Sequence, residues 1–479
     1  MLTKNNLLIF ILFFSHLILI NLYPVNFEHT FSDFSSKFII NPDEAITNYY
    51  RNQANTIIYP LIILLMEILI PFLDASQIGK LISSFGSILL GLAIIRFAKF
   101  YSIQKITILI FIICLNPFVW TMAHRGTPDF IAPSLAIFSV SFLIVDQNIL
   151  RKIFFSVLLG VAIAIKPTVG IILIYLNIHF LFKNNFNLIK SFKELLIINI
   201  ISTLILLLYL IFIYYNFNFF LTPPYFKQSL IIDNMYLFLN NFILYIGYTY
   251  MLIIPLRLSS LFTNFKKKNC YFNLTFLLFS IFIFLIGKIY FIPQLELNLS
   301  LVSKIIGRGV ENGIYTLCFI FFIIDCLFNK SYFSLQKKIV LPLFLTLITY
   351  FLIISFFSPS QRYIIVIIPF FYLIFFIFSK NNNYLLCILL YISLNSLLLV
   401  SQYINGKLSR EIVDDLTKNN LIALTCPGVI EAHAGNFFVL SNKDCINPIY
   451  HVVYGDRDKK ILFREIRILF ISKSLSVIN

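Results

Sequence analysis

Charged residues are scarce in this chain of 479 residues. Only 12% are Asp, Glu, Lys or Arg, whereas 59% are hydrophobic and the mean hydropathy is +0.90. A soluble domain carries about 25% charged residues, so the composition predicts that most of the chain lies in lipid. The apolar runs have the length of about 20 residues that spans a bilayer as a helix. They lack the alternation that a membrane β-barrel requires, which leaves an all-α polytopic membrane protein.

The chain also lacks a contiguous basic face, although its formal net charge is +16. Its lysines and arginines form short clusters between apolar spans, which is the pattern of cytoplasmic loops and not of a nucleic-acid-binding surface. We therefore expect no nucleic-acid partner. The first 23 residues resemble a signal sequence, but no small-residue cleavage site follows them. They predict a retained first helix.

None of the seven cysteines has the spacing of metal ligands. Four lie in or beside apolar spans, where a thiol packs as a small core residue: Cys114, Cys318, Cys326 and Cys387. Cys270 borders a basic loop. Cys426 and Cys445 fall in the polar C-terminal tail, where they either form a disulfide in an oxidising compartment or remain two thiols.

The basic clusters recur after alternate apolar spans and predict the orientation of the chain. They comprise residues 96–105, 151–152, 183–193, 257–268, 330–338 and 380. Assigned to the cytoplasm together with Lys4, they give a cytoplasmic N-terminus. Residues 57–73 conflict with this pattern if they cross, but they are short and interrupted by Glu67 and Pro71, which is typical of a re-entrant or interfacial helix. We therefore expect about thirteen transmembrane helices, with a helix break in KPTVG near Lys166.

This orientation places four polar segments on the non-cytoplasmic face. They are NPDEAITNYYR at residues 41–51 in the first external loop (24–56), AHRGTPD at 123–129, the loop 291–312, and SPSQRY at 358–363. Residues 405–479 emerge on the same face, and their charged and strand-like stretches predict a small α/β extramembrane domain. The transmembrane domain then comprises residues 1–404.

Lys166 and the acidic pair Asp43-Glu44 are the first candidate functional residues. Ionisable groups at membrane depth cost about 2.5–3.5 kcal/mol each and are functional candidates, and Pro167 breaks the helix beside Lys166. The alternative is that Lys166 reaches the interface from a short hairpin. Asp43-Glu44 can act as a general base or bind a divalent metal through oxygen. The plainer interpretation is that both acids offset a helix dipole, and both interpretations can hold.

Two further segments contain arginines. In RGTPD, Thr127 is predicted to be an N-cap, with Pro128 at the first and Asp129 at the second helical position. That prediction does not explain His124 and Arg125 just before the cap. Arg362, followed by Tyr363, stands at a predicted helix start, where a guanidinium can bind a phosphate through two hydrogen bonds. The alternative for Arg362 is an interfacial anchor.

Taken in order, these elements resemble the GT-C superfamily of integral-membrane glycosyltransferases. Protein O-mannosyltransferases and the aminoarabinose lipid A transferase are the most similar members. The matching elements over residues 1–400 are the acidic pair Asp43-Glu44, Tyr59-Pro60 before an apolar stretch, the R-x-x-x-D element Arg125 to Asp129, the GxAxAxK element Gly160 to Lys166, and Arg362-Tyr363 before a helix that contains Pro369.

The resemblance implies the GT-C fold and transfer, with inversion, of a hexosyl or pentosyl sugar from a polyprenyl-phosphate-linked donor. The acceptor is a glycan, lipid or protein at the external face of a bacterial inner membrane, and no cofactor is certain apart from a possible divalent metal at Asp43. Its motifs assign Asp43 as the base with Glu44 beside it. They assign Arg362, Lys166 and Arg125 to the donor phosphate, and Asp129, Tyr363, Tyr59 and His124 as further site residues.

This chain departs from the family pattern at two points. Leu61 stands where a second proline is common, and the Glu-Lys pair that the aminoarabinose transferase places before that element is missing, which argues against lipid A as the acceptor. Two other functions stay open. A flippase or transporter of lipid-linked saccharides should show inverted repeats, and the sequence shows no internal repeat. The early acidic pair and the folded tail weigh against a polymerase or ligase.

Overall fold

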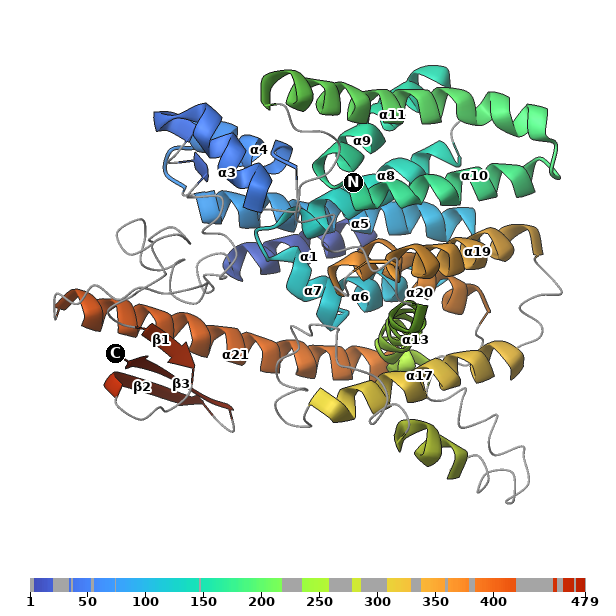
Figure 1. Ribbon diagram of the computed structural model, residues 1–479. Helices are drawn as coiled ribbons and strands as arrows, with labels where there is room; N and C mark the ends of the chain where they lie inside the picture. The colour runs from blue at the N-terminus through green and yellow to red at the C-terminus, as the bar shows by residue number, and fades with distance from the viewer. Residues whose placement is uncertain are drawn as a thin grey trace.

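The computed structural model describes most of the helical part of the chain. The described residues are 4–19, 34–35, 38–52, 56–73, 75–145, 148–217, 235–257, 278–285, 308–328, 337–357, 361–378, 384–418, 451–454, 460–468 and 471–478. Within them the molecule is a bundle of helices, with a small sheet beside the far end of one long helix (Figure 1).

The helices of the first half gather around α5. Their bounds are α1 (Lys4–Leu19), α3 (Pro42–Asn52), α4 (Ile58–Leu69), α5 (Ala75–Phe100), α6 (Ile106–Cys114), α7 (Pro117–Ala123), α8 (Pro128–Leu143), α9 (Ile149–Ile165), η1 (Pro167–Ile171), α10 (Ile172–Lys183) and α11 (Leu188–Phe217). Helix α5 packs along α8 and also contacts α1, and α9 packs against both α8 and α11 (Figure 1). This arrangement brings the start of α8 close to the end of α9.

The helices of the second half pack against this block at several places. Their bounds are α13 (Met235–Met251), α17 (Arg308–Phe328), α19 (Lys337–Ile354), η2 (Gln361–Val366), α20 (Ile368–Phe378) and α21 (Tyr384–Lys418). Helix α19 packs on α10, η2 contacts α8, and both α20 and α21 contact α6. Helices α13 and α17 approach closely at Gly247, where a Cβ atom would lie 1.9 Å from the carbonyl oxygen of Tyr315.

The C-terminal residues form an antiparallel sheet. Strands β1 (His451–Tyr454), β2 (Lys460–Ile468) and β3 (Ile471–Ile478) lie in the order β1-β3-β2, and β2 and β3 contact α21 (Figure 1). The predicted boundary between residues 404 and 405 falls inside α21. Cys426 and Cys445 lie outside the described residues, so the separate C-terminal domain and its disulfide stay predictions.

Helix lengths bear on the predicted membrane topology. In the described part of the chain, three helices are long and apolar enough to cross a membrane, and the pair α6 and α7, bent by 70°, makes a fourth if it is one span. About thirteen crossings therefore stays a prediction. Helix α4 has 12 residues, a length of about 18 Å against a hydrocarbon core of about 30 Å. Several other apolar helices are also shorter than a full span, so the expectation that residues 57–73 do not cross stays a prediction.

Candidate functional site

Lys166 stands at a break between two helices, as the KPTVG stretch predicts. Helix α9 ends at Ile165, Lys166 is extended (φ −142°, ψ 97°), and Pro167 opens η1. Proline has no N–H group, which favours the break at this position. The hydroxyl of Thr56 donates to the carbonyl of Ile165 at 2.9 Å, so a distant segment satisfies a backbone group at the break. The Lys166 side chain is buried.

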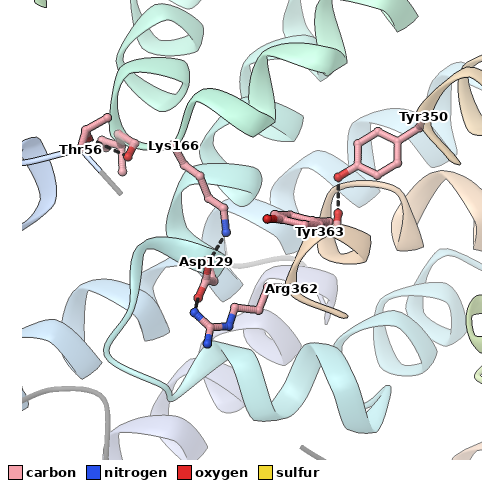
Figure 2. A network of polar contacts seen from close by, with 7 residues as sticks. Thr56, Asp129, Lys166, Tyr350, Arg362 and Tyr363 are labelled. Atoms are coloured by element: carbon pink, nitrogen blue, oxygen red, sulfur yellow. Dashed lines mark hydrogen bonds and ion pairs between the residues drawn. The ribbon is translucent and has the colours of Figure 1, made fainter. Parts of the chain in front are cut away.

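Asp129 brings two cations together. Its Oδ1 atom accepts a hydrogen bond from Nζ of Lys166, and its Oδ2 atom lies 3.7 Å from Nη1 of Arg362 (Figure 2). Helix α8 begins at Pro128, with Thr127 at the N-cap and Asp129 in the first turn, as predicted. These three charged residues, the Asp129 cluster, come from the start of α8, the end of α9 and η2.

Arg362 is the exposed member of the Asp129 cluster. One third of its side chain (33%) is exposed, compared with 6% for Lys166 and 3% for Asp129. The hydroxyl of Tyr350 donates to the carbonyl of Tyr363 (Figure 2), which holds η2 against α19. An incoming ligand can therefore reach the guanidinium, whereas the pair of Lys166 and Asp129 lies behind it.

The residues before α8 are positioned by close backbone packing. A Cβ atom at Gly79 of α5 would lie 3.0 Å from the carbonyl oxygen of Gly126. Arg125 is buried and close enough to Asp129 to interact with it electrostatically. Arg125 therefore belongs to the surroundings of the cluster. The hydroxyl of Tyr59 donates to the carbonyl of Gly79 at 3.1 Å, so this predicted site residue supports the α5 surface on which the loop rests.

His124 lies in an aromatic group beside the cluster. Its ring stacks on that of His16 from α1, with centroids 5.7 Å apart, and meets Trp120 edge-on at 4.6 Å. His16 is buried and was missed in the sequence because no motif surrounds it. The signal that singled out Lys166, an ionisable residue inside an apolar run, would also have found His16.

The structure places Asp43 and Glu44 at the exposed start of α3. The side chain of Asn41 accepts from the N–H of Glu44 at 3.3 Å and donates to its Oε2 atom at 3.4 Å, a helix-capping arrangement. Among the described residues, neither acid forms a hydrogen bond or ion pair with the Asp129 cluster. The helix-start interpretation therefore has a structural basis, while the catalytic role of Asp43 stays a prediction.

One buried residue of α3 lies near enough to Asp129 to interact with it electrostatically. Tyr49 is buried, and its burial, with Tyr209 and Asp129 nearby, raises the pKa of its hydroxyl above the usual range. Tyr49 follows Asp43 by six positions in α3, a rise of about 9 Å along the helix. The position of Asp43 relative to the Asp129 cluster therefore stays a prediction.

Among the described residues, Asp43 and Glu44 lack the further ligands that a metal site at Asp43 requires. The described residues contain no group of three or more His, Cys, Asp or Glu side chains arranged to hold a metal ion. Hard cations such as Ca²⁺ take about six to eight oxygen ligands, and Asp43 with Glu44 offers fewer. These residues do not fit a metal held by the protein alone, and we assign no step to one.

A second buried ion pair was not predicted from the sequence. Nε and Nη2 of Arg257 donate to Oδ2 and Oδ1 of Asp325 at 2.8 and 2.7 Å, and the hydroxyl of Tyr250 donates to Oδ2 at 3.1 Å. We call these three residues the Asp325 cluster. Arg257 was counted only as a cytoplasmic charge in the topology. The lone acid in the apolar run FIFFIID would have indicated Asp325.

The chain resembles one solved structure over nearly its whole length. The crystal structure of ArnT from Cupriavidus metallidurans bound to undecaprenyl phosphate is 12% identical, with a TM-score of 0.48, over 98% of this chain and 97% of that chain. No family model and no curated protein matches the sequence. At this TM-score the site has to be interpreted from the residues of this chain.

Proposed function

We propose that this protein is a GT-C glycosyltransferase of a bacterial inner membrane that uses a polyprenyl-phosphate-linked sugar donor. The observation that carries the proposal is the buried Asp129 carboxylate, which contacts both Lys166 and Arg362. These residues come from three of the motifs that define the resemblance. The acceptor is a glycan, lipid or protein, and the sugar is a hexose or a pentose.

The Asp129 cluster suits the phosphate of such a donor. The partly exposed guanidinium of Arg362 offers several N–H donors in one plane, which match two phosphoryl oxygens. Lys166 adds a charge from the protein interior. Because Asp129 contacts both cations, they are already positioned before a ligand binds, and that lowers the cost of ordering them.

The transfer itself requires stabilisation of negative charge. The acceptor oxygen attacks the anomeric carbon and forms the new C–O bond, while the C–O bond to the phosphate breaks and its electron pair stays on the phosphate oxygen. In-line displacement inverts the anomeric centre. Negative charge grows on the leaving phosphate, where fixed cations stabilise it. Asp43, with Glu44 beside it on α3, is the proposed base that takes the acceptor proton.

Transfer assays in membranes test this function. We expect Lys166→Met to abolish most release of polyprenyl phosphate from a polyprenyl-phosphate sugar, and Asp43→Asn to abolish transfer in a protein that still inserts and binds the lipid. Lys183→Met is the matched control, since Lys183 forms a partly exposed ion pair with Glu194 at 3.5 Å away from the cluster.

Normal transfer by Lys166→Met contradicts the phosphate site, and normal transfer by Asp43→Asn removes Asp43 from the mechanism. Saccharide movement across vesicles without polyprenyl phosphate release indicates a flippase instead.

The orientation is part of the proposal, with the N-terminus in the cytoplasm and residues 405–479 in the periplasm. A reporter fused after Asn479 measures it directly, and a cytoplasmic reporter signal contradicts the shared external face. Thiol labelling with and without a reductant shows whether Cys426 and Cys445 pair.

A further inference from the structure

Thr127 has a buried hydroxyl group that its position in the fold does not explain. The residue is 5% exposed, and its Oγ1 atom has no hydrogen-bond partner among the described residues. It occupies the N-cap of α8 without making a capping hydrogen bond. Buried hydroxyl groups are nearly always hydrogen-bonded, because leaving one unpaired costs free energy. This hydroxyl is therefore a candidate for a partner that binds from outside the chain.

Neighbouring helices show what an ordinary N-cap looks like in this protein. Asn116 accepts hydrogen bonds from the N–H groups of Phe118 and Val119 at the start of α7. Asn148 accepts from two N–H groups at the start of α9. Thr127 differs from both, since its backbone is in the N-cap conformation (φ −117°, ψ 157°) while its hydroxyl does not cap.

The start of α8 is also electrostatically suited to an anion. The first N–H groups of a helix have no partner within the helix, and the helix dipole adds a partial positive charge there. Asp129 contacts Lys166 and Arg362, and Thr127 precedes it by two positions. The start of α8 therefore carries two cations at Asp129 and, on the residue at its N-cap, a buried hydroxyl that is unpaired among the described residues.

We propose that the hydroxyl of Thr127 and the N-terminus of α8 bind a phosphoryl oxygen of a polyprenyl-phosphate lipid. This inference rests on the proposed function and adds to it a neutral donor that none of the recognised motifs assigns. A hydroxyl can donate its proton to a phosphoryl oxygen, and such a hydrogen bond to a charged acceptor is stronger than one between neutral groups.

The inference predicts opposite effects of Thr127→Val on the empty and the ligand-bound protein. Valine has nearly the same shape but no hydroxyl. In the lipid-free protein it removes an unpaired buried polar group, so the melting temperature should rise. For a polyprenyl phosphate the lost hydrogen bond should weaken binding about ten- to a hundredfold. An N-cap with a purely structural role predicts the reverse, a lower melting temperature and unchanged affinity.

The experiment uses the full-length protein in detergent with three probes. These are a short-chain polyprenyl phosphate, the matching polyprenol without phosphate, and inorganic phosphate, each titrated while binding and thermal unfolding are followed. Thr127→Ser retains the hydroxyl and should bind the phosphate lipid nearly as the unaltered protein does. Thr249→Val is the matched control, because Thr249 is also buried but its hydroxyl donates to the carbonyl of Tyr245 at 2.8 Å.

The binding results test the role of Thr127 separately from the proposed glycosyltransferase function. Weaker binding of the phosphate lipid by Thr127→Val, with polyprenol binding unchanged and normal binding by Thr249→Val, supports it. Equal affinity of Thr127→Val and the unaltered protein overturns it and leaves the proposed function standing. If inorganic phosphate binds as tightly as the lipid and depends equally on Thr127, the assignment to a lipid is wrong. If the unaltered protein binds neither phosphate probe, the proposed function fails as well. Should Thr127→Val not fold, the same titrations with Thr127→Ala decide between these outcomes.

Discussion

Asp325 and Asp129, the two buried carboxylates among the described residues, have contrasting surroundings. Asp325 receives both arms of one guanidinium at 2.7 and 2.8 Å and a tyrosine hydroxyl at 3.1 Å, and Arg257 is only 1% exposed. Asp129 divides its oxygens between two cations, one of which lies 3.7 Å away and is 33% exposed. The Asp325 cluster is closed and internally satisfied, whereas the Asp129 cluster opens toward solvent through Arg362.

This difference distinguishes a structural ion pair from a candidate binding site. Burying charges carries a desolvation penalty, which good geometry and extra hydrogen bonds offset. The Asp325 cluster meets that condition by itself and joins α17 to the end of α13. In the Asp129 cluster the contact with Arg362 is longer, at 3.7 Å, and the hydroxyl of the neighbouring Thr127 is unpaired within the described part of the chain. A bound phosphate would accept hydrogen bonds from both of these groups.

The largest expected effect is on stability, at the Asp325 cluster. Asp325→Leu alone leaves the buried Arg257 charge without its carboxylate, which should cost about 3–5 kcal/mol. The double variant Arg257→Met with Asp325→Leu should recover most of that loss, because it removes both charges together. Thermal unfolding in detergent measures both. A folded single variant that has lost only transfer would show instead that the closed pair is functional.

The next effect is on activity, at the Asp129 cluster. Lys166→Met should lower kcat for transfer about 10²- to 10³-fold, since it removes a fixed charge that stabilises the leaving phosphate. It should destabilise the protein less than Asp325→Leu does, because Arg362 remains beside Asp129. Steady-state kinetics with unfolding measurements on the same preparation check both expectations. Equal losses of stability at the two clusters would remove the distinction between them.

The sequence predicts the local parts of this comparison and misses the long-range ones. Pro167 places the break at Lys166, and the Thr-Pro-Asp order places the start of α8, since both depend on neighbouring residues. The pairing of Arg257 with Asp325 spans 68 positions and depends on how α13 and α17 pack. No local pattern contains that information.

For Asp43 and Glu44, too, the sequence predicts the local helix start but not the long-range packing. The DE motif and the charge pattern predict that Asp43 lies on the same side of the membrane as Lys166 and Arg362. Helix-start chemistry correctly predicts acids in the first turn of α3. How far the α3 carboxylates lie from the Asp129 cluster depends on the packing of α3 against the bundle. Tyr49, in the same NPDEAITNYYR segment, is buried and interacts electrostatically with Asp129, which no local pattern predicts.

A smaller effect is expected at the exposed member of the open cluster. Arg362→Lys keeps the charge but replaces the planar fork by a single ammonium group, so donor affinity should fall about tenfold. Stability should change by less than about 0.5 kcal/mol, as for other partly exposed positions. Titration with a polyprenyl phosphate measures the affinity. An unchanged affinity would mean that the guanidinium does not bind the phosphate through two hydrogen bonds.

The smallest expected effect concerns the backbone that positions the open cluster. In Gly79→Ala the new Cβ atom would lie 3.0 Å from the carbonyl oxygen of Gly126, so the loop between Arg125 and Thr127 must move by a few tenths of an ångström. A shift of that size should lower transfer by about tenfold or less, because catalysis depends steeply on position. Gly170→Ala is the control, since its Cβ would meet the side chain of Ile163 at an ordinary 3.4 Å. Kinetics that change equally in both variants would indicate that loop placement does not set the activity. A loss confined to Gly79→Ala would show that the open cluster, unlike the closed one, depends on a loop that its own ion pairs do not hold.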